Sequence, residues 1–367
     1  MISCLPMKTK TSITTLTVPE TTIGIDLGDR SHAFCILDAS GEIIEEGKIR
    51  NERDFLRRLS EKYPEARIVM EVGTHSPWIS RFLQGLGNEV LVANPRKLKF
   101  IYEDDRKCDK HDARSLAQFG RIDPRVLHPI QHQSAEAQRD LLQIKLRDSI
   151  VRQRVDLISA VRGTLKAQGI SLPSPNTNYF TKQARQNLSD DYPEMLALIE
   201  DTLEVIDVMT KKIKELTRKI ENLVEEKYPE TKRFMQIRGI GPITALTYRL
   251  TIDDPTRFKK SRDVGAYLGM VPKRDQSGDV DKQLRISKAG DAYLRRLLVS
   301  AAQYVLGPHG EDCDLRRHGL ALAERGGQGA KKKAVIAIAR KLSVILHTLW
   351  TQEADYEPLR EEVKEAA

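Results

Sequence analysis

The feature that most constrains the fold is a change in hydrophobic pattern near residue 133. Before it, short β-branched runs such as TTIGIDLGDR and ARIVMEVG are typical of strands. Between them, NERDFLRRLSEKYP and SPWISRFLQGLG have helical spacing, and Asn51 is the expected N-cap of the first helix. The order of elements is β-β-β-α-β-α-β-α. This half of the chain is therefore predicted to be a mixed α/β domain.

The second half has the pattern of long charged helices. One helix is expected from about residue 133, and a second runs through EMLALIEDTLEVIDVMTKKIKELTRKIENLVEEKYP, with a break rich in Pro, Asn and Ser between them. Apolar residues of the second helix repeat roughly as a heptad, which predicts an antiparallel helical hairpin. The pattern leaves two alternatives open, an intramolecular helix pair and a dimerising coiled coil.

These patterns predict five segments. Residues 232–350 are expected to be helical with glycine-rich turns, and the residues after them are acidic. The expected organisation is a flexible arm (1–20), an α/β catalytic domain (21–130), a helical hairpin linker (131–231), a mainly helical C-terminal domain (232–350) and an acidic tail (351–367).

The charge favours an anionic partner. The chain of 367 residues has a net charge of +8, and residues 256–296 contain eleven Lys or Arg and five Asp, which points to nucleic acid. The cysteines form no CxxC pair, so neither a zinc site nor a disulfide framework is indicated. No apolar run approaches a membrane span and no signal peptide is indicated, so a cytoplasmic protein without a membrane partner is expected.

Four acidic residues stand at the ends of the predicted elements. Asp26 ends the first strand, Glu71 ends the fourth, and Asp109 and Asp112 share one face at the start of a later helix. In an RNase-H-like sheet the fourth strand lies beside the first, so these positions can converge. Converging carboxylates repel one another unless a cation is present, and their oxygens suit Mg²⁺ or Mn²⁺. The set therefore predicts a two-metal site for phosphodiester chemistry.

Each acid alone has a simpler explanation, as a turn cap, a solvated strand end or a helix-start residue. The segment GIDLG also occurs in sugar-kinase and actin-like ATPases. That alternative predicts a second phosphate loop later in the chain, which we do not find.

The C-terminal half offers nucleic-acid contacts. The segment around Gly239 and Gly241 resembles a helix-hairpin-helix element, whose backbone N–H groups hold a DNA phosphate. DQSGDVDKQ is expected to be a polar loop that exposes Ser277, and Ser287 is an expected N-cap. Basic residues expected to contact nucleic acid are Lys97, Lys99, Lys273, Arg274, Arg285, Lys288, Arg295 and Arg296.

Six segments in the same order resemble the DEDD-motif insertion-sequence transposases of the IS one-ten family, with the Piv-type DNA invertases as relatives. They are IGIDLG, MEVGTHS, NPRKLKFIYEDDRKCDKHDARSLA, IRGIGPITA, YLGMVPKRDQSG and RISKAGDAYLRRLL. The resemblance implies a RuvC-like domain of RNase H fold, a coiled-coil linker and a C-terminal transposase domain. It places the DEDD acids on Asp26, Glu71, Asp109 and Asp112, and the nucleophilic serine on Ser277.

The resemblance also implies partners and a mechanism. Family members bind a structured bridge RNA that pairs with target and donor DNA, and their domains build composite active sites across a dimer or tetramer. We therefore expect a prokaryotic, nucleoid-associated recombinase that forms a phosphoserine–DNA link. The alternatives are a RuvC-like Holliday-junction nuclease without a covalent intermediate and a nucleic-acid-binding scaffold with an inactive site. Target sequence, guide sequence, subunit number and the choice between transposition and inversion stay open.

Overall fold

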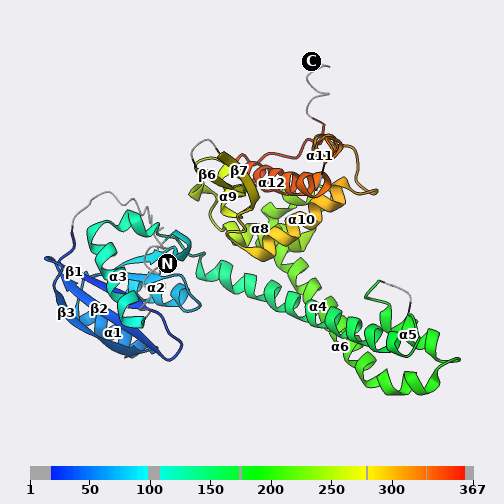
Figure 1. Ribbon diagram of the computed structural model, residues 1–367, viewed down its shortest axis with the longest axis horizontal. Coiled ribbons are helices and arrows are strands. Elements are labelled where there is room, and N and C mark those ends of the chain that lie inside the picture. The colour runs from blue at the N-terminus through cyan, green and yellow to red at the C-terminus, as the bar shows by residue number, and fades with distance from the viewer. Residues whose placement is uncertain (1–17, 98–107, 173–175, 278–279, 328, 360–367) are drawn as a thin grey trace, which may run out of the picture. The chain divides into compact units, whose positions relative to one another are not determined.

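The computed structural model describes residues 18–97, 108–172, 176–277, 280–327 and 329–359 (Figure 1). Lys99 and most of the expected N-terminal arm lie outside these residues. Contacts within the chain divide it into two compact units, Met1–His132 and Gln133–Ala367, which are described separately.

A five-stranded mixed sheet is the centre of the N-terminal unit. Its strand order is β3-β2-β1-β4-β5, in which β1 pairs antiparallel with β2 and parallel with β4. The antiparallel meander and the position of the fourth strand beside the first agree with the order of elements expected from the sequence. The strands are β1 (Thr21–Asp26), β2 (Ser31–Asp38), β3 (Ile43–Arg50), β4 (Arg67–Glu71) and β5 (Glu89–Ala93).

Helices cover both faces of this sheet. On one face, Ile25 and Met70 pack into a core with Leu56 of α1 and Ile79 of α2, and α3 lies on the opposite face. The predicted cap of the first helix is wrong: Glu52 holds the N-cap position without a side-chain bond, and the Asn51 amide instead donates to the Asp29 carbonyl. The helical segments are α1 (Arg53–Lys62), α2 (Ser76–Gly85), η1 (Pro95–Lys97), α3 (Asp109–Ile122) and η3 (Pro124–Leu127).

The C-terminal unit begins with two long helices, α4 (Ala135–Ala167) and α6 (Pro193–Lys227), which pack against each other along their length (Figure 1). Their contact includes two polar pairs: Arg147 donates to Thr217 at 2.8 Å, and Arg154 donates to Thr210 at 3.1 Å. A shorter helix, α5 (Phe180–Leu188), completes the apolar core of the hairpin and was not expected from the sequence.

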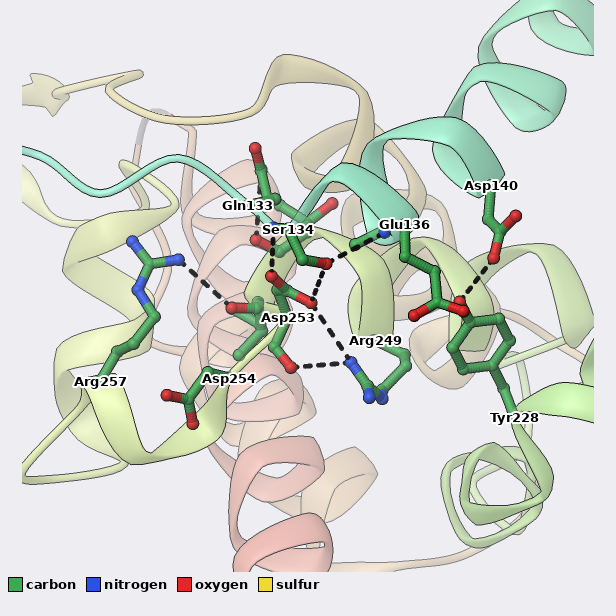
Figure 2. A network of polar contacts seen from close by, with 12 residues as sticks. Gln133, Ser134, Glu136, Asp140, Tyr228, Arg249, Asp253, Asp254 and Arg257 are labelled. Atoms are coloured by element: carbon green, nitrogen blue, oxygen red, sulfur yellow. Dashed lines mark hydrogen bonds and ion pairs between the residues drawn. The ribbon is translucent and has the colours of Figure 1, made fainter. Parts of the chain in front are cut away.

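The start of α4 is anchored to the residue that follows helix α8 (Pro242–Ile252), as Figure 2 shows. The Asp253 carboxylate accepts hydrogen bonds from the Ser134 backbone N–H at 2.6 Å and from its hydroxyl at 3.1 Å. Asp253 has φ +62 and ψ −64, and the Asp254 N–H donates to the Ile252 carbonyl across it, which makes a strained γ-turn. The contacts to Ser134 hold this turn in place, so α4 belongs to the C-terminal unit from its first residue.

The remaining helices surround a second core that contains Tyr248, Leu298 and Leu342. Two predictions were wrong here. Much of the expected polar loop pairs as an exposed β-hairpin, and Asp291 rather than Ser287 caps α10. The elements are η4 (Pro229–Thr231), α7 (Lys232–Met235), α8 (Pro242–Ile252), η5 (Pro255–Arg257), α9 (Arg262–Tyr267), β6 (Pro272–Ser277), β7 (Val280–Ile286), α10 (Ala292–Leu306), α11 (Asp314–Glu324) and α12 (Ala330–Thr351).

By length and composition, one helix in the described part of the chain, α12, could cross a membrane. Its side chains Ile338, Leu342 and Leu346 are fully buried in the second core. A core helix passes the same test, so α12 is explained by packing within the protein.

Candidate active site

Asp26 and Glu71 lie side by side at one edge of the sheet. The parallel register of β1 and β4 pairs Ile25 with Met70, and the two acids are the next residue on each strand. Neighbouring strands are about 4.8 Å apart, so the two backbones bring these carboxylates to adjacent positions.

Close packing places the start of α3 over the same edge. A Cβ on Gly24 would lie 2.0 Å from the Ala113 carbonyl oxygen, and one on Gly120 would lie 2.3 Å from a methyl group of Val69. Ala113 therefore lies over Gly24, while Gly120 lies nearer Thr22, so α3 runs antiparallel to β1. The N-terminus of α3 consequently points toward the end of β1 that carries Asp26.

Side-chain alternation puts the acids on the face that α3 covers. Asp26 is two residues from Gly24, and Glu71 is two residues from Val69, so each acid shares a face with a residue that contacts α3. Asp112 immediately precedes Ala113 in the helix. Three acids from distant parts of the sequence are thus carried by neighbouring backbones.

The fourth acid is engaged elsewhere. The Asp109 carboxylate lies 3.3 Å from the Lys48 ammonium group, and both side chains are mostly exposed, at 66% and 62%. Lys48 is paired with Ala33, which in turn is paired with Asp26, so this contact is two strands away from Asp26. Exposed ion pairs contribute about 0.2–1 kcal/mol, so little free energy opposes release of Asp109.

Within the described ranges, no three His, Cys, Asp or Glu side chains gather closely enough to hold a metal ion. The donors that the fold brings to this edge are carboxylates. Oxygen donors of this kind suit Mg²⁺ or Mn²⁺ and not a thiolate-preferring metal. The residue types therefore fit a hard divalent cation, although the side chains are not assembled around one point.

A histidine next to this edge was missed in the sequence analysis. His75 Nε2 lies 3.0 Å from an Asp29 carboxylate oxygen, and the Trp78 indole N–H donates to His75 Nδ1 at 3.3 Å. Because Nδ1 accepts a hydrogen bond, Nε2 carries the proton and donates to Asp29. The bond joins the loop after Asp26 to the start of α2. The segment MEVGTHS, in which His75 follows Glu71 by four residues, was the available signal.

His32 begins a second contact at the same loop. Its ring is fully buried, and Nδ1 accepts from the Gly28 N–H at 3.2 Å. Burial lowers the pKa of His32, and the neighbouring His75 adds to the effect, while hydrogen bonds from Asn51 and Gly28 oppose it. A neutral His32 therefore supports the turn that follows Asp26.

The serine expected as nucleophile lies in the C-terminal unit. Ser277 is the last residue of β6, and its backbone is paired with Val280 of β7. Gly278 and Asp279, which connect the strands, lie outside the described residues. The hairpin exposes Lys273 and Arg274, and Arg274 forms an ion pair with Asp281 at 2.6 Å.

The other expected nucleic-acid contacts have different surroundings. Arg285 is exposed on β7, Lys288 is exposed just after that strand, and Lys97 is exposed in η1. Arg295 donates to the carbonyls of Leu268 and Ala289, which gives it a structural role, and Arg296 pairs with Asp148 at 2.6 Å.

The glycine hairpin has a clear geometric requirement. Gly239 has φ +92 and packs against Tyr304 of α10, so a side chain there would be strained. Gly241 is the N-cap of α8 and has open space where a Cβ would be. The turn therefore leaves the N-terminus of α8 approachable.

Two family profiles match the chain. Residues 23–169 match the DEDD-type transposase domain named for IS110, and residues 231–313 match the domain described as transposase IS116/IS110/IS902 family. The first match contains all four acids, and the second contains Ser277. The chain belongs to the IS110 family of transposases.

Curated relatives agree with this assignment. The transposase of insertion sequence element IS1111A from Coxiella burnetii is 26% identical, over 91% of this chain and 90% of its own length. The transposase of IS1328 from Yersinia enterocolitica is 27% identical over 77% of this chain and 83% of its own length. A pilin gene-inverting protein of Moraxella lacunata is 29% identical over 33% of this chain and 37% of its own length.

This IS110-family transposase is therefore an enzyme that cleaves and transfers DNA strands. DNA is its substrate, and DEDD transposase domains typically depend on a divalent metal. The family assignment confirms the resemblance found in the sequence.

Proposed function

We propose that this transposase joins DNA through a phosphoserine intermediate at Ser277, with the acids Asp26, Glu71, Asp109 and Asp112 as its metal ligands. A structured bridge RNA would select donor and target by base pairing. The observation that supports the proposal most directly is the adjacent placement of Asp26 and Glu71 beneath the start of α3.

The chemistry divides between the two units. The Ser277 hydroxyl attacks phosphorus and loses its proton, one phosphorus–oxygen bond forms, and the bond to the leaving deoxyribose oxygen breaks as that oxygen takes up a proton. A divalent cation bound by the carboxylates would offset the negative charge that develops on the phosphoryl oxygens. The exposed cations Lys273 and Arg285 bind the flanking phosphates, and the turn at Gly239 contacts the DNA backbone.

The fold of each unit is consistent with these separate roles. The mixed five-stranded sheet of the N-terminal unit would be a RuvC-like domain, and α4 with α6 would form the coiled-coil linker. We propose that the domains assemble composite sites in a dimer or tetramer. The excess of cations in residues 256–296 supports binding of both DNA and the guide RNA.

The test is a suicide DNA substrate supplied with the bridge RNA. Wild type is expected to trap a covalent protein–DNA adduct, and Ser277→Ala is expected to form none. Ser287→Ala, which changes a serine ten residues further along, is the matched control and should still form the adduct. Metal-dependent cleavage without an adduct in wild type would support the RuvC-like junction nuclease instead.

A further inference from the structure

A large groove runs from the base of the β6–β7 hairpin along α12 in the C-terminal unit. Its volume is about 1540 Å³, and its walls come from α10, α11, α12, the hairpin and the segment around Tyr356. Ligand pockets for drug-sized molecules are typically about 300–1,000 Å³, so this groove could hold more than one nucleotide.

The floor of the groove is aliphatic. Ile336 and Val344 of α12 face it, and Leu284 of β7 contributes a side chain that is 49% exposed. The opposite side of α12 packs in the core through Ile338 and Leu342. Ile336 and Val344 therefore form a second, half-buried apolar side of α12 that is not part of this core.

The rim of the groove is basic. Seven exposed cations border it, and leaving Lys288 aside none of them forms an ion pair with an acid in the described part of the chain. Elsewhere in the same unit, cations such as Arg317 and Lys212 are paired with nearby acids. Two acids, Asp314 and Glu357, also line the groove, so the balance is strongly positive. Besides Lys288, the cations are Arg262, Arg285, Lys332, Lys333, Arg340 and Lys341.

His318, in the wall of the groove, is also affected by these positive charges. The pKa of His318 lies below its ordinary value because burial disfavours its charged form, and the positive charges of Lys341 and Arg325 add to this. An anion entering the groove would therefore meet a positive surface before it reaches the aliphatic floor.

We propose that this groove binds an unpaired segment of the DNA strand, with its phosphates on the basic rim and its bases against the aliphatic floor. A duplex keeps its bases stacked inside, so only an unpaired strand can present base faces to such a floor. The strand is taken to be DNA because DNA is the substrate of this transposase. The inference rests on the proposed function, because the groove adjoins the base of the hairpin whose first strand ends at Ser277.

The experiment measures binding of the full chain to a fluorescein-labelled oligothymidylate of about twelve nucleotides by fluorescence anisotropy. Ile336→Asn and Val344→Asn place a polar group on the floor and are expected to weaken binding about ten-fold. Leu320→Asn changes an exposed leucine of α11 outside the groove and should bind as wild type does.

The rim has its own matched pair. Affinity for the oligothymidylate should fall with salt concentration. Lys332→Gln and Lys333→Gln should each make the slope of log affinity against log salt less steep by about 0.7. Lys331→Gln, on the same helix but outside the groove, should change the slope less. Melting temperatures near that of wild type would show that the variants fold.

Three results would overturn the proposal. The floor variants could bind the oligothymidylate as tightly as wild type, could lose binding of the matched oligouridylate alone, or could lose self-association alone. Ser277→Ala carries an intact groove and should keep oligothymidylate binding. Formation of the covalent adduct therefore tests the proposed function, and oligothymidylate binding measured by anisotropy tests the proposed role of the groove.

Discussion

Asp26 and Glu71 occupy neighbouring positions at the ends of two hydrogen-bonded parallel strands, one residue beyond the paired Ile25 and Met70. Acids there face α3, whose first turn carries Asp109 and Asp112. Because the arrangement depends on backbone register and on helix packing, it can be perturbed without changing any of the acids.

Replacing Gly24 should displace α3. In Gly24→Ala the new methyl group would overlap the Ala113 carbonyl, and overpacking of this kind costs about 1–3 kcal/mol of unfolding free energy. Gly73→Ala is the control, because a Cβ there meets nothing within 4 Å. Urea unfolding followed by Trp78 fluorescence in a Trp350→Phe background would report on the N-terminal unit. Equal stability of the two variants would contradict the close packing.

Removing Lys48 should strengthen metal binding if Asp109 is a ligand. Lys48 holds the Asp109 carboxylate in an exposed ion pair, so Lys48→Met is expected to raise Mn²⁺ affinity about two- to five-fold. Lys62→Met breaks a similar exposed pair with Glu45 and should have no effect. Titration calorimetry measures both. Unchanged affinity in Lys48→Met would remove Asp109 from the ligand set.

Asp140 should make stability depend on pH. Burial alone would raise the pKa of Asp140, but hydrogen bonds from Lys227 at 2.5 Å and Tyr228 at 2.6 Å lower it overall. Figure 2 shows Asp140 and Tyr228 facing each other. The same cluster raises the pKa of Tyr228 to about 12, first through burial. A depressed carboxyl pKa gives stability that is present above about pH 4 and is lost as the pH falls through the folded-state pKa.

Asp140→Asn should therefore lower the unfolding free energy by about 1–3 kcal/mol at pH 7, with the difference shrinking below pH 4. Asp201→Asn, an exposed change on α6, should match wild type throughout. Urea unfolding across the pH range measures the difference. A difference that stayed constant with pH would show that the charge of Asp140 is not the cause.

The strands of the N-terminal unit were predictable because β-branched runs such as ARIVMEVG leave few alternatives. The β6–β7 hairpin was not, since PKRDQS has no apolar alternation; its strands are joined by backbone pairing and by the Arg274–Asp281 ion pair. Helix α5 was missed because Phe180, Ala184 and Leu188 are its only buried apolar residues and a Pro-rich break precedes it.

The backbone positions of the acids in the candidate site were predictable from the sequence, but the contacts of their side chains were not. Spacing places Asp26 and Glu71 at strand ends, and the register then makes them neighbours. Spacing gives no information about side-chain partners, so the ion pair of Asp109 with Lys48 and the link from His75 to Asp29 could not be foreseen.

The most direct test of the carboxylate site is Mn²⁺ binding to the full chain, measured by electron paramagnetic resonance. Wild type is predicted to bind Mn²⁺, Asp26→Asn and Glu71→Gln are each predicted to bind at least about ten-fold more weakly, and Asp54→Asn, an exposed acid of α1, is predicted to bind as wild type does. Mn²⁺ affinity that is the same in all four proteins would contradict the account.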